Sequence, residues 1–326
     1  MINCFVSFAA GLLIVFFLMP SLIDRLKRLS FNQTVSEYSL QEYREKARTP
    51  IMGGLLFIFA PIVVTIVSQF VFGFNAEAVF LILSLTGYGL IGFIDDYLIA
   101  VKKNNEGLLP WKKFLMQVIL AVILFLLYRM SGAPLSLRIP FANTSLYLGG
   151  FYIALILFMF AGSSNAVNLT DGMDGLAAGC AIPSFAVFLI LSILAKKPTL
   201  VTFFASLIGA LFGYLYYNVK PAKIFMGDTG SLALGGALAG GALILKQELA
   251  LIVIGGVFVI ETLCVMIQLG SVHIRHKRVF PYTPIHYAFV LPKEKGGLAM
   301  GEVQTVHFFW LASLIFALLG LFVALH

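Results

Sequence analysis

Acidic residues gather at three points along this sequence of 326 residues, each beside a long apolar stretch. Five of the six Asp belong to these groups: Asp95 and Asp96, Asp171 and Asp174, and Asp228. Adjacent carboxylates repel each other unless a cation or a proton lies between them. Oxygen ligands suit Mg²⁺ or Mn²⁺, and a metal held by one or two carboxylates takes its other ligands from water and substrate phosphates. The acids therefore predict metal-assisted phosphate chemistry.

Glycines accompany two of the three acidic groups. The segment Asp171–Leu176 (DGMDGL) precedes one apolar stretch, and Gly227–Ser231 (GDTGS) precedes another. Each predicts a tight turn leading into a helix, where free backbone N–H groups and the positive end of the dipole favour an anion. Because Gly and Asp are also ordinary turn and capping residues, the support for phosphate binding comes from the recurrence of the pattern.

The elements that must position these residues are membrane helices. Hydrophobic residues make up 60% of the chain, charged residues only 11%, and the mean hydropathy is +0.98, whereas a soluble chain carries about 25% charged residues. A helix needs about 20 apolar residues to cross the hydrocarbon core. We therefore predict an all-α integral membrane protein, a single polytopic domain over residues 1–326 with about ten transmembrane helices. The apolar stretches are 4–23, 51–73, 77–94, 112–130, 148–163, 175–195, 199–217, 230–245, 248–269 and 304–325.

The basic residues predict the orientation of these helices. Seventeen of the 22 Lys and Arg fall in loops on one side, and five fall on the other: Arg129, Arg138, Lys196, Lys197 and Lys246. Since cytoplasmic loops are enriched in Lys and Arg, we expect the richer side to be cytoplasmic and both termini to be outside. The acidic groups lie on the cytoplasmic side. The net charge of +7 then reflects topology, and we expect no nucleic acid partner.

Glu261 lies inside the predicted span 248–269. An acid within a membrane is a functional candidate, but a lone acid forms no proton relay. We interpret Glu261 as a protonated residue hydrogen-bonded to a neighbouring helix. The three cysteines, at positions 4, 180 and 264, show no metal-binding spacing, and no disulfide is expected.

Four motifs occur together in this chain: Arg48–Gly54 (RTPIMGG), Gly92–Tyr97 (GFIDDY), Asn165–Gly175 (NAVNLTDGMDG) and Asn218–Gly236 (NVKPAKIFMGDTGSLALGG). Together they resemble the polyprenyl-phosphate N-acetylhexosamine-1-phosphate transferase superfamily. Within it, the last motif is most similar to the phospho-N-acetylmuramoyl-pentapeptide transferases. The resemblance covers nearly the whole chain and implies ten spans, outside termini and a small outside β-hairpin, which the alternation within 135–148 also favours.

The resemblance implies a reaction. Phospho-N-acetylmuramoyl-pentapeptide would pass from a uridine diphosphate donor to undecaprenyl phosphate, forming lipid I and releasing UMP, the first membrane step of peptidoglycan synthesis. It also implies a Mg²⁺ cofactor, with Mn²⁺ as an alternative, a homodimer, and a place in the bacterial cytoplasmic membrane with the active site facing the cytoplasm. The lipid phosphate could attack directly or after an aspartyl intermediate forms. We favour direct attack, because a phosphate monoester is already a competent nucleophile near neutral pH.

The resemblance also assigns roles to residues. Asp95 and Asp96 match the catalytic aspartate pair, and Asp228 matches a catalytic residue that is the Mg²⁺ ligand. His286 matches a position important for activity. The residues implied to bind the uridine diphosphate substrate are Lys46 and Lys103 at the diphosphate, Phe225 on the uracil ring, and Asn168, Asp171, Asp174 and Asn218.

The chain departs from the resemblance after Pro284. Pentapeptide-transferring members have three consecutive His, whereas this chain has His286, Tyr287 and Ala288, and its segment Gly296–Glu302 (GGLAMGE) differs from a Gly-Trp-Ser-Glu-like pattern. These differences concern the donor more than phosphoryl transfer. One alternative is therefore a related transferase for another UDP-N-acetylhexosamine. An alternative from a different class is a cation-coupled transporter, whose ionisable groups would lie near the bilayer midplane.

Overall fold

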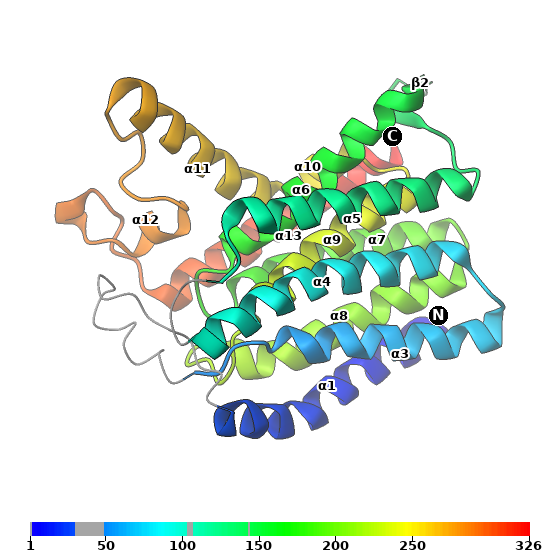
Figure 1. The fold of residues 1–326 in the computed structure, drawn as a ribbon, viewed down its shortest axis with the longest axis horizontal. Coiled ribbons are helices and arrows are strands. Elements are labelled where there is room, and N and C mark those ends of the chain that lie inside the picture. Colours follow the sequence, from blue (N-terminus) through cyan, green and yellow to red (C-terminus); the bar gives the residue numbers. More distant parts are fainter. Residues whose placement is uncertain (1, 30–48, 103–106, 143) are drawn as a thin grey trace.

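A computed structural model describes residues 2–29, 49–102, 107–142 and 144–326, and most of them form a bundle of long helices (Figure 1). The helices are α1 (Ile2–Arg28), α3 (Gly54–Phe72), α4 (Ala76–Lys102), α5 (Pro110–Met130), α6 (Tyr152–Thr170), α7 (Leu176–Leu194), α8 (Pro198–Asn218), α9 (Gly227–Ile244), α10 (Ala250–Ile254), α11 (Gly256–Arg275), α12 (His286–Val290) and α13 (Glu302–Leu325). The strands β1 (Ser136–Ile139) and β2 (Thr144–Tyr147) form one antiparallel hairpin.

Nine of the helices in the described part of the chain are long and apolar enough to cross a membrane: α1, α3, α4, α5, α6, α7, α8, α11 and α13. Their outer faces carry many exposed large hydrophobic side chains, as expected of helices that face lipid. Helix α9 coincides with the predicted span 230–245 but is glycine-rich, and it does not reach the apolar character required of the nine spans. The architecture is therefore the predicted all-α membrane bundle.

Helix α9 occupies the centre of the bundle. Every residue from Thr229 to Leu243 is buried, and the helix packs against α4, α6 and α3. Small residues let helix backbones approach closely. A Cβ on Gly235 of α9 would overlap the backbone of Ser163 and Ser164 in α6, and a Cβ on Gly92 of α4 would overlap the backbone of Asp228. Gly92 thus allows the two helices that carry Asp95, Asp96 and Asp228 to touch.

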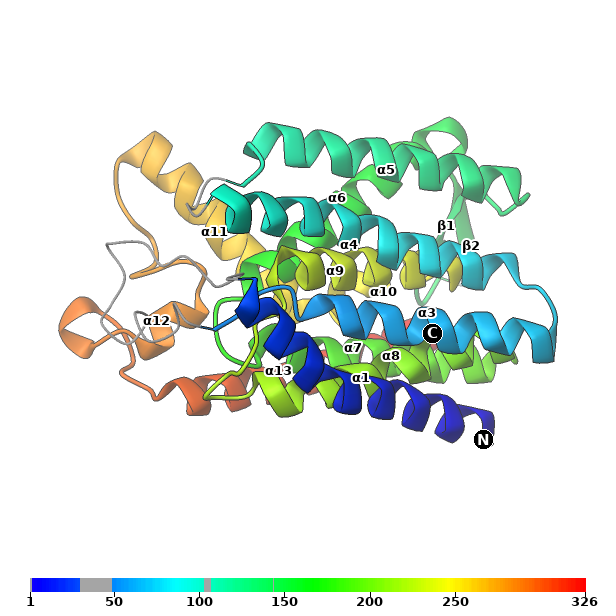
Figure 2. The same cartoon turned by 60° about the horizontal axis from the view of Figure 1, so that its bottom comes forward.

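The two ends of the bundle differ. The first described residue and the C-terminus lie at the end that carries the hairpin (Figures 1 and 2), and the backbone N–H of Phe141 donates to the carbonyl of His326 at 3.0 Å. The opposite end carries α12 and the C-terminal end of α11, which is inclined to the long helices (Figure 1). The predicted hairpin segment 135–148 thus contains β1 and β2, while the side of the membrane to which each end belongs stays a prediction.

Several predicted boundaries were wrong, and those near the acidic residues and Glu261 matter for the site. Helix α4 continues past residue 94 to Lys102, and α6 continues past residue 163 to Thr170, so Asp95, Asp96 and Asn168 lie on helices and not in loops. Polar side chains end an apolar stretch without ending a helix, because buried partners satisfy them. The predicted span 248–269 is divided at Gly255 into α10 and α11, and α11 extends to Arg275.

Candidate active site

Asp96 caps the N-terminus of α9. Its carboxylate is buried, Oδ1 accepts the backbone N–H of Asp228 at 3.0 Å, and Oδ2 accepts the backbone N–H of Thr229 at 2.9 Å and its hydroxyl at 2.6 Å. The first N–H groups of a helix have no partner within the helix, and a carboxylate there also interacts favourably with the helix dipole. Asp96 therefore holds the turn that carries Asp228.

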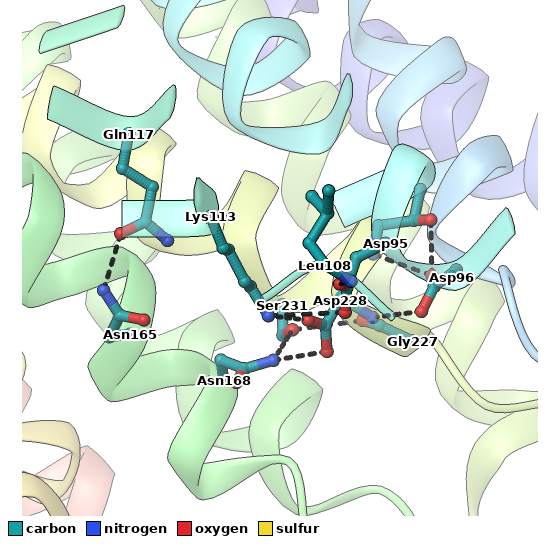
Figure 3. Close-up of polar contacts among 11 residues, drawn as sticks. Asp95, Asp96, Leu108, Lys113, Gln117, Asn165, Asn168, Gly227, Asp228 and Ser231 are labelled. Carbon is teal, nitrogen blue, oxygen red and sulfur yellow. Dashed lines mark hydrogen bonds and ion pairs between the residues drawn. The ribbon is translucent and has the colours of Figure 1, made fainter. Parts of the chain in front are cut away.

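Lys113 of α5 contacts two of the predicted catalytic carboxylates (Figure 3). Its Nζ donates a hydrogen bond to Asp228 Oδ2 and lies 3.6 Å from Asp95 Oδ2. The other oxygen of Asp95 accepts the backbone N–H of Leu108 at 2.6 Å. The side chains of Lys113 and Asp228 are 17% and 22% exposed, so the ion pair is only partly screened by solvent.

Asn168 of α6 also forms a hydrogen bond with Asp228. Its Nδ2 donates to Asp228 Oδ1 at 2.7 Å and to the Ser231 hydroxyl at 2.9 Å, and that hydroxyl donates to the Gly227 carbonyl at 3.1 Å. Both carboxylate oxygens of Asp228 are thus fixed, one by α5 and one by α6 (Figure 3). We call Asp95, Asp96, Lys113, Asn168 and Asp228 the carboxylate cluster.

A second link holds α5 and α6 together one turn away from the carboxylate cluster. Gln117 Oε1 accepts a hydrogen bond from Asn165 Nδ2 at 2.8 Å, and the backbone carbonyl of Gln117 accepts the Tyr88 hydroxyl of α4 at 3.0 Å (Figure 3 shows the Gln117–Asn165 pair). Gln117 follows Lys113 by four residues, which places both on one helix face. The Gln117–Asn165 hydrogen bond therefore fixes how α5 and α6 lie against each other, and so positions Lys113 and Asn168 at Asp228.

Three predicted substrate residues lie in or beside the loops that surround this site. Asn218 Oδ1 accepts the backbone N–H of Gly175 at 3.0 Å, its Nδ2 donates to the Ile224 carbonyl at 2.9 Å, and Asp174 Oδ2 accepts the backbone N–H of Ala222 at 3.1 Å. Asn218 and Asp174 are buried, and they join the loop 171–175 to the loop 219–226. Asp171 is half-buried at the C-terminal end of α6.

Phe225 is half-buried against the hydrophobic core, and its backbone N–H donates to the Pro50 carbonyl at 2.9 Å. Its carbonyl accepts the backbone N–H of Gly53 at 2.8 Å, so the segment before α9 pairs with the segment before α3. Lys46 and Lys103, which we expected at the diphosphate, lie outside the described residues.

His286 lies against the loop 171–175, at the first position of α12. A Cβ on Gly172 would overlap Nε2 of His286, and the Tyr287 hydroxyl donates to the Gly172 carbonyl at 3.2 Å. On its other side, the Nδ1 atom of His286 is 3.2 Å from Glu261 Oε1 of α11. The structure thus groups the other predicted catalytic residues in the carboxylate cluster and sets His286 beside the loop that carries Asp171 and Asp174.

Sequence reasoning missed the contacts of Lys113, which it counted only as a topology signal, and the link between Glu261 and His286. The signal for Lys113 was Gln117, a polar residue four positions later within an apolar stretch. Glu261 accepts the backbone N–H groups of Ile285 and His286 at 2.8 and 3.2 Å. The predicted hydrogen bond to a neighbouring helix is confirmed at His286, the first residue of α12. The second partner, Ile285, lies in the loop before that helix, and the protonated state of Glu261 stays a prediction.

The donor set of the carboxylate cluster fits Mg²⁺. Among the described residues no group of three or more His, Cys, Asp or Glu is arranged to enclose a metal ion. Mg²⁺ does not require one, since it is usually held by one or two carboxylates and by substrate phosphates. A carboxylate has about four lone-pair positions, of which Asn168 and Lys113 occupy two on Asp228. Asp228 and Asp95 can therefore supply hard oxygen ligands to a cation that arrives with a diphosphate.

The chain is similar to known proteins over its full length. Residues 78–246 match the family model described as glycosyl transferase family 4, a range that includes all five residues of the carboxylate cluster. The phospho-N-acetylmuramoyl-pentapeptide-transferase of Staphylococcus haemolyticus (strain JCSC1435) is 46% identical over 326 residues, which covers 99% of each chain. The enzyme of the same name from Staphylococcus carnosus (strain TM300) is 45% identical over 318 residues, or 96% of this chain and 97% of that one. The chain therefore belongs to the phospho-N-acetylmuramoyl-pentapeptide transferase family, within glycosyl transferase family 4.

Proposed function

We propose that this protein transfers phospho-N-acetylmuramoyl-pentapeptide from its uridine diphosphate donor to undecaprenyl phosphate, forming lipid I and releasing UMP. The observation that carries the proposal is the carboxylate cluster at one end of the bundle, inside a chain that is 46% identical to a transferase of that name along its whole length. The family match leaves the transporter alternative without support.

The chemistry requires two polyanions to meet. A phosphate oxygen of the lipid forms a bond to the sugar-linked phosphorus, the diphosphate bond breaks, and UMP leaves with the electron pair of that bond. Donors placed before the reaction stabilise charge that develops in the transition state without reorganisation. Lys113 supplies a positive charge, and its pairing with Asp228 and Asp95 fixes its position.

The residues of the carboxylate cluster have different roles in this reaction. Asp96 caps α9 and orients Asp228, and Asn168 holds the second oxygen of Asp228. Asp95, whose Oδ2 lies 3.6 Å from Lys113 Nζ, would accept a proton from the lipid phosphate. Asp228, with Asp95, would hold Mg²⁺, which when bound neutralises phosphate charge as a Lewis acid. We favour direct attack by the lipid phosphate, and Asp95 then needs no covalent role.

The proposal also includes the setting of the reaction. The excess of Lys and Arg in the loops at the site end supports a cytoplasmic orientation in a bacterial cytoplasmic membrane, where a uridine diphosphate donor is soluble and the lipid acceptor lies in the same bilayer. The homodimer implied by the resemblance is a further part of the proposal, and the mass of the purified protein in nanodiscs tests it.

A transfer assay tests the function. Purified protein in nanodiscs receives Mg²⁺, undecaprenyl phosphate and radiolabelled UDP-N-acetylmuramoyl-pentapeptide, and lipid-linked product and UMP are quantified. We expect equal amounts of both products, and none without the lipid phosphate. Folded protein that yields no product from any UDP-amino sugar would refute the transferase assignment.

One observation favours an alternative sugar nucleotide as the donor substrate. Tyr287 and Ala288 stand where two imidazoles occur in pentapeptide-transferring members, and the Tyr287 hydroxyl is bonded to the loop 171–175. The same assay with radiolabelled UDP-N-acetylglucosamine distinguishes the donors. A kcat/KM higher for N-acetylglucosamine than for the muramoyl-pentapeptide donor would replace the first proposal by the second.

A further inference from the structure

Glu261 is a fully buried acid whose role in the reaction is not established by the site described above. It belongs to α11, which is long and apolar enough to span the membrane. Its Oε2 accepts the backbone N–H of Ile285 at 2.8 Å, and its Oε1 accepts the backbone N–H of His286 at 3.2 Å. A buried carboxylate is costly unless such donors satisfy it. Both donors belong to the segment that presents His286.

The imidazole of His286 is also fully buried, and its two nitrogens face different partners. Nδ1 lies 3.2 Å from Glu261 Oε1, the same oxygen that accepts the backbone N–H of His286. Nε2 lies on the opposite side of the ring, against Gly172. Neither nitrogen is hydrogen-bonded to any described residue. In the absence of substrate, hydrogen bonds that orient catalytic groups are often poorly aligned and tighten when the substrate binds.

A carboxylate beside one imidazole nitrogen determines which nitrogen carries the proton. The N–H group faces the carboxylate, because a proton there gains a charge-assisted hydrogen bond, and the lone pair then belongs to the other nitrogen. In His286 this arrangement leaves the lone pair on Nε2, which faces the loop 171–175. Asp171 and Asp174 of that loop are predicted to bind the donor nucleotide.

We propose that Glu261 is a positioning residue: it keeps His286 in the Nδ1–H form and presents Nε2 to the donor at the loop 171–175. The expected effect of Glu261 on the reaction rate rests on the proposed function. The protonation state of the His286 ring can be measured whether or not that function is correct. Glu261 acts through His286 and does not touch the substrate.

Two kinetic measurements test this role. We expect Glu261→Gln, which keeps the size of the side chain and removes its charge, to lower kcat about 10- to 100-fold, the usual effect of a group that orients a ligand or base, with little change in KM. In a protein that already carries His286→Asn, Glu261→Gln should cause no further loss. Losses that multiply in the double variant would overturn the proposal, because residues that act independently give additive free energies.

Glu248 provides a matched control. Its side chain is also fully buried, and it pairs with Lys246 at 2.7 Å at the hairpin end of the bundle. The effect of Glu248→Gln, whatever its size, should be the same with and without His286→Asn. Unfolding midpoints of all variants separate a loss of folded protein from a loss of kcat.

The tautomer of His286 gives a test that does not depend on activity. Nitrogen NMR of the [¹⁵N]histidine-labelled protein in bilayers, with His286 assigned by comparison with His286→Asn, reports which ring nitrogen carries the proton. We expect Nδ1–H in the wild type and a gain of Nε2–H in Glu261→Gln. An Nε2–H ring in the wild type would refute the positioning role. An Nδ1–H ring in a protein inactive with every donor would refute the proposed function alone.

Discussion

The carboxylate of Asp96 accepts both the backbone N–H and the hydroxyl of Thr229, so a side chain from α4 forms the cap of α9. This contact gives Asp96 a different role from the adjacent Asp95, although the sequence alone could not distinguish the two acids. Asp95 points to Lys113, whereas Asp96 is fully used in holding the first turn of α9.

Asp96→Asn should therefore lower both stability and activity. An amide oxygen at the Oδ2 position can keep the two hydrogen bonds from Thr229, but the amide N–H₂ then faces the backbone N–H of Asp228. Loss of a helix cap costs about 0.5–2 kcal/mol. Asp95→Asn, the matched variant, should abolish most activity with little change in stability. Thermal unfolding and kcat are measured for both. An Asp96→Asn protein as stable as the wild type would contradict the capping role.

Lys113→Met should lower kcat roughly 100-fold, the usual cost of removing one preorganised donor from a reacting phosphoryl or acyl group. Its ammonium is also the cation between Asp95 and Asp228. The neighbouring Lys112, which is exposed and lies over the Trp111 ring, serves as control. Lys112→Met should retain activity within about threefold, since exposed charges contribute little. Equal losses in the two variants would show that only the positive charge at the start of α5 matters.

Activity should depend on Mg²⁺ through Asp228. Removal of the metal with EDTA should stop transfer, and Mg²⁺ should restore it. Asp228→Asn should raise the Mg²⁺ concentration needed for half-maximal rate at least tenfold, because a neutral oxygen binds a hard cation more weakly. Asp174→Asn, whose carboxylate accepts the Ala222 N–H, should leave that concentration unchanged. If both variants need the same Mg²⁺ concentration as the wild type, Asp228 is not a metal ligand.

Gly172→Ala should reduce activity strongly. The new methyl group would overlap His286 Nε2 and lie 2.8 Å from the Tyr287 hydroxyl, so the loop 171–175 and α12 must separate. Gly162→Ala in α6 is the control, because nothing lies within 4 Å of its added Cβ, and Ala favours a helix over Gly by about 1 kcal/mol. Comparable kcat values for the two variants would show that the contact between His286 and the loop is dispensable.

Much of this arrangement could be predicted from the sequence. The lengths of the apolar stretches predicted the membrane helices. Because the chain has few charged residues, the positions of Asp95, Asp96 and Asp228 could be interpreted one by one, and they predicted that these acids converge. The motif resemblance assigned Asn168 to the substrate site. The structure places it in contact with Asp228, and its role in binding substrate stays a prediction.

The remaining features depend on contacts that composition does not encode. The apolar pattern ends before Asp95, yet α4 continues, because partners on α9 and the loop before α5 satisfy the two carboxylates. Lys113 resembles any basic residue at a membrane boundary until α5 and α9 are placed side by side. Glu261 is 25 residues from His286, and only the return of the chain after α11 brings them together.

The close contact between Gly92 of α4 and the backbone of Asp228 in α9 limits how substrates can reach the carboxylates. Because the two backbones touch there, no substrate can pass between α4 and α9 at Gly92 to reach Asp95 or Asp228. The spacing between these two acids is also set before either substrate binds. The protein therefore loses little conformational entropy there on binding, and under the proposed function we expect adaptation to the donor at the loop 171–175 and α12.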